Sequence, residues 1–297
     1  MHQAPKILFY EERSVSKCVE TTFDFMRSCR RLWLVTSLVL FAPVSLVLGF
    51  SLYTNGEYNF DMENWFSGVL FKWGDAWSYV FLFVFFLGVW MCFVHVYSLL
   101  LAYEDHGPAV DSLSQRSMFP NYKRVALRSW WMAVLFGLAL YYFFVRKSSF
   151  EIFSVPMFFI FIVMAFLVPL PPLVVFERQS LSDALTKTMR LGFSAWFTSL
   201  FTLLLTTFFG SLIITSIEFP LLLLSGITVT LFQGVEWLDS HSWLAQIPVC
   251  LLSTFVYFGF FVLLSMVLMA GAYQFGSVSE RVDEASLDND IDHFEQL

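Results

Sequence analysis

Charged residues are scarce in this chain. Asp, Glu, Lys and Arg together account for 14% of its 297 residues, against roughly a quarter in soluble domains. A composition that is 58% hydrophobic and 20% aromatic holds more apolar surface than a water-soluble fold of this length can bury. The scarcity excludes a soluble enzyme and a disordered protein. Apolar runs of more than about 18 residues are instead typical of a polytopic helical membrane protein.

Cysteine pairs, metal-ligand spacings and catalytic motifs are also missing. Four cysteines occur without a Cys-x-x-Cys or Cys/His pattern, which excludes a disulfide scaffold. The sequence contains no Gly-rich phosphate loop, His-Glu-x-x-His or Gly-x-Ser-x-Gly motif. With a formal net charge of −7, it offers no basic field for nucleic acid. We therefore expect no catalytic residue, no cofactor and no metal.

Long apolar segments predict an all-α fold, a polytopic transmembrane bundle of about six spans with cytoplasmic amphipathic helices. Each segment is long enough to cross about 30 Å of hydrocarbon. The predicted spans are 32–53, 77–103, 125–145, 152–176, 195–217 and 248–275. They form a single transmembrane domain over 1–275, followed by an acidic cytoplasmic tail over 276–297. Prolines in the first and fourth spans predict interrupted helices there.

The apolar run 219–232 does not fit six simple crossings, because it is too short to span the membrane comfortably. It follows Glu218 and contains Pro220. Two interpretations stay open, a re-entrant or interfacial segment on the external side and an extension of the fifth helix past Pro220. Glu218 is expected at the outer face, which leaves His95 as the clearest ionisable group within the membrane.

Basic residues decide the orientation of the bundle. With the N-terminus inside, 14 of the 17 Lys and Arg residues lie in cytoplasmic segments. Lys and Arg in short loops are retained on the cytoplasmic side. We therefore expect both termini in the cytoplasm.

An internal repeat links two cytoplasmic segments. Residues 11–28 align without gaps with residues 177–194, and both carry an apolar stripe with the i, i+3, i+4 spacing of one helical face. Ser14 and Ser180 are suited to cap the two amphipathic helices, and each helix leads directly into a span. A degraded third copy, interrupted by Pro120, follows Gly107. The repeat is explained either by common origin or by chance similarity of Ser-rich helices. The amphipathic helices themselves lie either in the headgroup layer or as a cap on the cytoplasmic end of the bundle, and both pairs of alternatives stay open.

Two motifs carry a family resemblance. The opening segment 12–16 (Glu-Arg-Ser-Val-Ser) precedes an amphipathic helix, and the central segment 171–177 (Pro-Pro-Leu-Val-Val-Phe-Glu) is followed by a Ser-capped Ala-Leu helix. In these motifs and in topology the chain resembles uncharacterised bacterial six-helix proteins, similar to the membrane domain attached to some glycerophosphodiester phosphodiesterases. Its Phe-rich composition resembles Bacteroidetes members. The resemblance implies a multi-pass protein of the bacterial inner membrane, and it does not carry over the phosphodiesterase activity of the separate barrel domain.

Candidate functional residues fall into two sets. The first is polar and lies within the membrane or at the cytoplasmic ends of the second and fourth spans, where carboxylate and imidazole groups suit a divalent metal or a lipid amine. The alternatives are a polar helix contact for the intramembrane histidine and a solvated helix end for the others. This set comprises His95, Glu104, Asp105, His106, Glu177 and Arg178. The second set consists of cations suited to an anionic leaflet: Lys17, Arg27, Arg30, Arg31, Lys187 and Arg190.

The missing catalytic constellation and the repeated surface helices favour a non-enzymatic, membrane-organising or complex-forming subunit. Its partners are expected to be membrane lipids and a protein bound at the cytoplasmic helices or the acidic tail. A transporter of lipids or small solutes, using proline-broken helices, is the alternative from another class. A third hypothesis is an intramembrane lipid-modifying enzyme built around His95 or around the cluster from Glu104 to His106.

Six crossings place the tail in the cytoplasm, and cysteine labelling tests this. In a Cys250→Ser background, a Ser286→Cys variant should resist a membrane-impermeant maleimide in intact cells and react after permeabilisation. Asn64→Cys, in the loop expected outside, is the matched control and should react in intact cells. Labelling of the tail in intact cells would instead indicate a seventh crossing.

Overall fold

A computed structural model describes residues 6–55, 76–113, 115–132, 134, 165–232 and 242–283. Every regular element in these ranges is a helix, and they contain no strand. The predicted all-α helical bundle is therefore confirmed. The elements are α1 (Val15–Ser28), α2 (Arg30–Asn55), α4 (Ala76–His106), the short 3₁₀ helix η2 (Gly107–Ser112), α5 (Gln115–Arg128), α8 (Leu170–Val175), α9 (Leu181–Phe232) and α11 (Ser242–Asp283).

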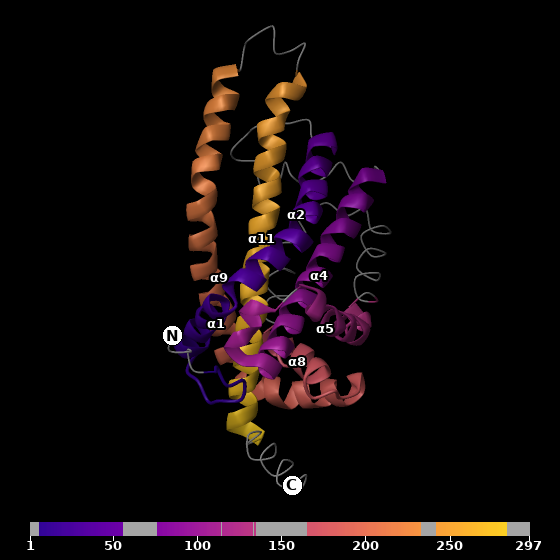
Figure 1. Ribbon diagram of the computed structural model, residues 1–297, viewed down its shortest axis with the longest axis vertical. Helices are drawn as coiled ribbons and strands as arrows, with labels where there is room; N and C mark the ends of the chain where they lie inside the picture. The colour runs from indigo at the N-terminus through magenta and orange to yellow at the C-terminus, as the bar shows by residue number, and fades with distance from the viewer. Residues whose placement is uncertain are drawn as a thin grey trace.

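Four helices contain segments long and apolar enough to cross a membrane: Arg30–Ser51, Val80–His106, Leu181–Pro220 and Cys250–Asp283. They correspond to the first, second, fifth and sixth predicted spans, and they make this a membrane protein. Figure 1 shows α2, α4, α9 and α11 rising from the end of the bundle at which α1, α5 and α8 lie. Most of the third and fourth predicted spans, residues 135–164, lie outside the described part of the chain.

Prolines interrupt the helices less than expected. The first predicted span is one helix, α2, which continues through Pro43. α9 continues through Pro220 to Phe232, so the extension of the fifth helix is the interpretation of 219–232 that agrees with the structure. The expected interruption is present in the fourth predicted span, where a turn at 168–169 precedes α8. Pro169 stands at the N-cap of α8, where its missing N–H costs no helical hydrogen bond.

The last helix is longer than its apolar run predicts. α11 continues beyond Phe275 to Asp283, although the sequence placed the start of the tail at residue 276. Val278 and Ser279 are both buried. This end of α11 is therefore covered by other parts of the protein, and its length is set by packing as well as by the membrane. Residues 284–297 of the predicted tail lie outside the described ranges.

The two aligned segments have the same local structure. α1 is a 14-residue helix with Ser14 at its N-cap, and it ends at Cys29 with φ −113° and ψ 27°. The corresponding part of α9 starts after Ser180, whose hydroxyl accepts a hydrogen bond from the Asp183 N–H at 3.3 Å. It ends at Ala195 with the closely similar φ −133° and ψ 15°. Each amphipathic helix therefore bends into a span at the equivalent residue of the repeat.

α5 resembles the other two surface helices. Like α1 it has 14 residues, and a turn at Ser129 separates it from the helical residues that follow. Pro120 lies inside α5 without ending it. The third predicted span was therefore placed too early, because Val125 belongs to the surface helix. Two sets of equivalent residues are 0% exposed in all three copies: Cys18, Met118 and Ala184, and Phe25, Val125 and Leu191.

Close helix contacts surround α11, which lies between α9 and α2 in Figure 1. At Gly49 of α2, an added Cβ would stand 2.9 Å from the Thr254 backbone nitrogen and 3.0 Å from the Cys250 carbonyl oxygen. The two backbones approach so closely that only glycine fits between them, as is common in membrane helix pairs. Gly88 of α4 receives the ring of Phe261 in a similar way.

Gly49→Ala is expected to destabilise the protein by about 1–3 kcal/mol, because its methyl group meets backbone atoms that cannot rotate away. Gly271→Ala on α11 is the matched control, since an added Cβ there meets Val168 Cγ1 at an ordinary 3.5 Å. The midpoint of thermal unfolding in detergent measures both effects. Equal midpoints for the two variants would contradict the close approach of α2 and α11.

Candidate functional site

His95 joins three helices in the interior of the bundle. It lies on α4 and is 0% exposed. Its Nδ1 is 2.9 Å from the Tyr122 hydroxyl of α5, and its Nε2 is 3.2 Å from the Ser37 hydroxyl of α2. A neutral imidazole has one N–H and one free lone pair, so one of its nitrogens donates and the other accepts. Both nitrogens are therefore occupied by protein groups, and the arrangement is that of a polar helix contact.

A second buried ionisable group lies on α9. Glu218, expected at the outer face, stands near the end of the apolar Leu181–Pro220 segment. Its Oε1 is buried without a hydrogen-bond partner among the described residues, and it occupies the space that a Cβ on Gly259 of α11 would need. The sequence did not predict this contact between α9 and α11.

The polar residues predicted at the cytoplasmic ends of two spans do not form one cluster. Glu104, Asp105 and His106 are exposed at the end of α4, and His106 Nδ1 is 3.1 Å from the carbonyl oxygen of Ala102 in its own helix. Glu177 lies apart from them and binds Lys187 at 2.7 Å. Within the described ranges, no three His, Cys, Asp or Glu side chains are arranged to hold a metal ion.

A segment that the sequence did not single out lies between these acidic residues. Residues 6–13, here called the N-terminal strap, cross the ends of α4, α8 and α11. The Lys6 ammonium donates to the Glu104 carbonyl oxygen at 2.7 Å, and the Ile7 N–H donates to the Tyr103 hydroxyl at 3.3 Å. The Phe9 ring packs on Phe176 with ring centroids 4.6 Å apart. Burial, together with the negative charges of Glu177 and Glu104, raises the pKa of Tyr10.

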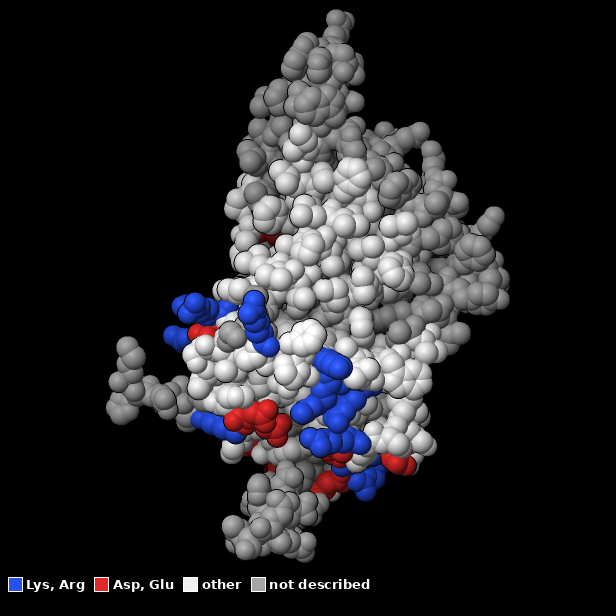
Figure 2. Space-filling view, turned by 45° about the vertical axis from the view of Figure 1, so that its right-hand side comes forward, with Lys and Arg blue, Asp and Glu red and all other residues white. Residues whose placement is uncertain are grey.

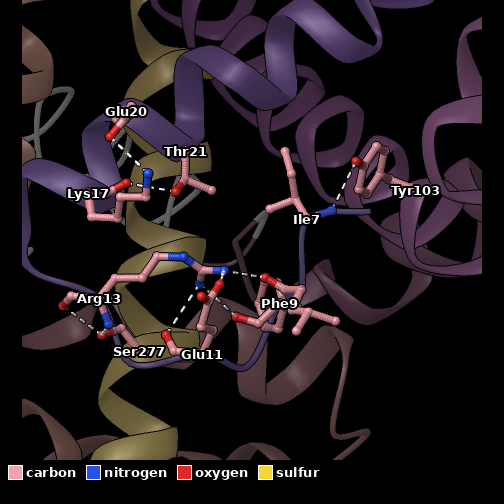
Figure 3. Close-up of polar contacts among 10 residues, drawn as sticks. Ile7, Phe9, Glu11, Arg13, Lys17, Glu20, Thr21, Tyr103 and Ser277 are labelled. Atoms are coloured by element: carbon pink, nitrogen blue, oxygen red, sulfur yellow. Dashed lines mark hydrogen bonds and ion pairs between the residues drawn. The ribbon is translucent and has the colours of Figure 1, made fainter. Parts of the chain in front are cut away.

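Arg13 holds the strap in its curved shape (Figure 3). Its side chain is 2% exposed, and its guanidinium donates to the carbonyl oxygens of Leu8 at 2.6 Å, Phe9 at 3.3 Å and Glu11 at 3.3 Å. It also pairs with the Glu11 carboxylate and lies 5.6 Å from the centroid of the Tyr273 ring. This cation is saturated by the protein and is not available to a ligand.

The strap is fastened to α11 by backbone contacts. The Arg13 N–H donates to the Ser277 hydroxyl at 2.8 Å, and this hydroxyl donates back to the Arg13 carbonyl oxygen at 3.0 Å. At Gly276 an added Cβ would stand 2.2 Å from the Phe9 carbonyl oxygen, so glycine is required there. These contacts explain why α11 continues past the predicted end of its span.

The six cations expected to meet lipid fall into two groups. Three have carboxylate partners: Lys17 with Glu20 at 3.0 Å, and Lys187 at 3.4 Å and Arg190 at 2.5 Å with Asp283. The others, Arg27, Arg30 and Arg31, are exposed. They stand where α1 turns into α2, and Asp111 of η2 caps this turn by accepting hydrogen bonds from the backbone N–H groups of Arg31 and Leu32 at 2.7 and 3.1 Å.

Two surface helices expose large apolar side chains beside their buried faces. We call these side chains the interfacial stripes. On α5 and just after it the stripe is Phe119, 69% exposed, Leu127, 67%, and Trp130, 61%. On the first part of α9 it is Leu185, 42%, Met189, 56%, and Phe193, 68%. Figure 2 shows Lys and Arg gathered in a band below a large uncharged surface, and both surface helices lie at this end of the bundle in Figure 1.

His95→Leu is expected to lower the free energy of unfolding by about 1–3 kcal/mol, because Ser37 loses its partner and Tyr122 loses one of its own. Ser98→Ala is the matched control on the same helix, since the Ser98 hydroxyl is equally buried and has no partner in the described structure. Its stability should be unchanged or higher. Thermal unfolding in detergent distinguishes the two, and an unaltered midpoint for His95→Leu would contradict the linking role of His95.

Comparisons with known proteins find no counterpart for this chain. No family model, no curated protein and no solved structure matches it. What the protein does is therefore inferred from its own geometry and chemistry.

Proposed function

We propose that this protein is a non-enzymatic subunit of the bacterial inner membrane that organises lipid at the cytoplasmic surface. In this proposal, α5 and the first part of α9 lie in the headgroup layer, with their interfacial stripes toward the acyl chains. Both termini are cytoplasmic. The single observation that carries the proposal is the exposure of Phe119, Leu127 and Phe193, each above 65%, on helices whose opposite face is fully buried in the bundle.

The shape of each surface helix supports a position at the membrane boundary. Large apolar side chains exposed to water are unfavourable, whereas a helix lying in the interface buries them among headgroups and acyl chains. Trp130 follows directly after the turn at Ser129, and Trp196 follows directly after the kink at Ala195. They are 61% and 38% exposed, and tryptophan is enriched at this depth of the bilayer.

The first copy of the repeat has a different surface. Val19, which corresponds to Phe119 and Leu185, is 5% exposed, because α1 packs against α9 and α11. At the positions equivalent to Leu127 and Trp130 of the α5 stripe, α1 carries Arg27 and Arg30, and both arginines are exposed. In the proposed arrangement, α1 therefore meets the leaflet with cations at its end, while α5 and α9 meet it with apolar side chains.

Depth-dependent quenching tests the position of the stripes. Phe119→Cys and Phe193→Cys variants, made in a Cys250→Ser background and labelled with a fluorophore, are reconstituted in vesicles that carry a nitroxide at the headgroup or in the acyl chain. Glu20→Cys, on the exposed polar side of α1, is the matched control. Burial raises the pKa of Cys18 to about 11 and that of Cys29 to about 12, so these thiols stay protonated and react slowly with the label.

Both stripe positions should be quenched several-fold more strongly by the lipid nitroxides than Glu20→Cys. They should also be shielded from a water-soluble quencher such as iodide. Iodide quenching of Phe119→Cys and Phe193→Cys equal to that of the control would overturn the headgroup position of the two helices.

A further inference from the structure

Three arginines gather where the end of α5 meets the end of α8. Arg124 and Arg128 are four residues apart on α5 and share one face of the helix. The Arg128 guanidinium donates to the carbonyl oxygen of Val175, in the last turn of α8, at 2.7 Å. Arg178 follows three residues later and has φ 55°, the positive value found at no other described non-glycine residue. Arg178 thus lies just after the end of α8 and near enough to Arg128 for its positive charge to act on that guanidinium.

No carboxylate neutralises this cluster in the described part of the structure. Arg13, Lys187 and Arg190 each pair with an acidic side chain, whereas Arg124, Arg128 and Arg178 form no such pair. Partial burial, followed by the positive charges of Arg178 and Arg124, lowers the pKa of Arg128. Acidic residues outnumber basic ones in the chain, whose net charge is −7. The missing carboxylate partners of these arginines are therefore a local feature and do not reflect a shortage of acidic residues.

We propose that Arg124, Arg128 and Arg178 bind a phosphate group, presented by an anionic phospholipid of the cytoplasmic leaflet. Like charges held together are unfavourable unless an anion joins them, and guanidinium groups match phosphate oxygens with two parallel hydrogen bonds. Arg128 keeps donors for this purpose because a guanidinium has five N–H groups and the Val175 carbonyl engages one nitrogen, Nη1. Exposed Leu127 and Trp130, adjacent in sequence, offer apolar contact to the acyl chains.

This site gives Arg178 a different role from the one expected from sequence. The sequence grouped it with Glu177 and the acidic end of α4 as a metal or lipid-amine site. Glu177 binds Lys187 instead, and Arg128 is affected first by its partial burial and then by the positive charges of Arg178 and Arg124. The site therefore selects an anion. It rests on the proposed function in one respect, because a lipid phosphate reaches the cluster only where α5 lies at headgroup level.

Native mass spectrometry of the purified full chain tests the site with phosphatidylglycerol and phosphatidylcholine as probes. Wild-type protein should retain phosphatidylglycerol in preference to phosphatidylcholine. The Arg124→Gln/Arg178→Gln variant should lose about tenfold in retained phosphatidylglycerol, since two charge-assisted contacts disappear. Arg116→Gln/Arg281→Gln removes the same charge from exposed positions at the start of α5 and the end of α11, outside the cluster, and should stay within about twofold of wild type.

Two further measurements distinguish a folding defect from a loss of binding and identify the source of the phosphate. Arg124→Lys/Arg178→Lys keeps both charges, so retention intermediate between wild type and the Gln pair supports guanidinium recognition. Stabilisation of wild type by inorganic phosphate, without retention of phosphatidylglycerol, would support the anion site and overturn lipid as its source. Equal losses in the two Gln pairs would overturn the site, and the quenching of the interfacial stripes would still decide the proposed function independently.

Discussion

The structure depends on one constraint, that each surface helix has an apolar face to bury before the chain enters the membrane. Helices α1, α5 and the first part of α9 all bury equivalent residues, such as Phe25, Val125 and Leu191. Because a straight helix would carry this face away from the bundle, the chain bends at Cys29, Ser129 and Ala195. The spans that follow α1 and the first part of α9 then rise from the surface helices at equivalent positions. The same local bend therefore follows each of the three surface helices and keeps these helices together at one end of the bundle.

Polar contacts determine which helices pack together, because hydrophobic contact alone does not favour one neighbouring helix over another. In lipid, apolar side chains pack against helices and acyl chains alike, so small residues and hydrogen bonds determine which helices meet. His95 joins α4 to α2 and α5, and Trp90 of α4 donates to Ser129 at the bend after α5. Thr202 of α9 donates to Gln274 of α11 at 3.0 Å. At the end of the bundle where the surface helices lie, the N-terminal strap packs across the three aromatic residues Tyr103, Phe176 and Tyr273.

The charges of the protein divide according to this architecture. Arg13 of the strap and two cations of α9, Lys187 and Arg190, have carboxylate partners and stabilise the fold, as Lys187 does between Glu177 and Asp283. Cations on α5 and at the start of α2 have none in the described structure, and they lie at the level of the interfacial stripes. A division of this kind suits a surface that meets an anionic leaflet. The structure also distinguishes cations that the sequence placed in one group of lipid contacts. Tertiary folding places carboxylates within ion-pair distance of Lys187 and, in the described structure, not of Arg31.

Local and periodic features were determined by the sequence by itself. Apolar runs predicted the helical bundle, serines at positions 14 and 180 predicted the two caps, and the alignment of 11–28 with 177–194 predicted helices that now prove equivalent down to their bends. These features depend on residues within one or two helical turns, where spacing alone decides the outcome. The partners of His95, the fastening of the strap to Ser277, the contact of Glu218 with Gly259 and the meeting of Arg128 with Val175 were decided only by the tertiary structure. Each joins residues far apart in the chain, and no periodicity in a single sequence records which distant helix a polar side chain will face.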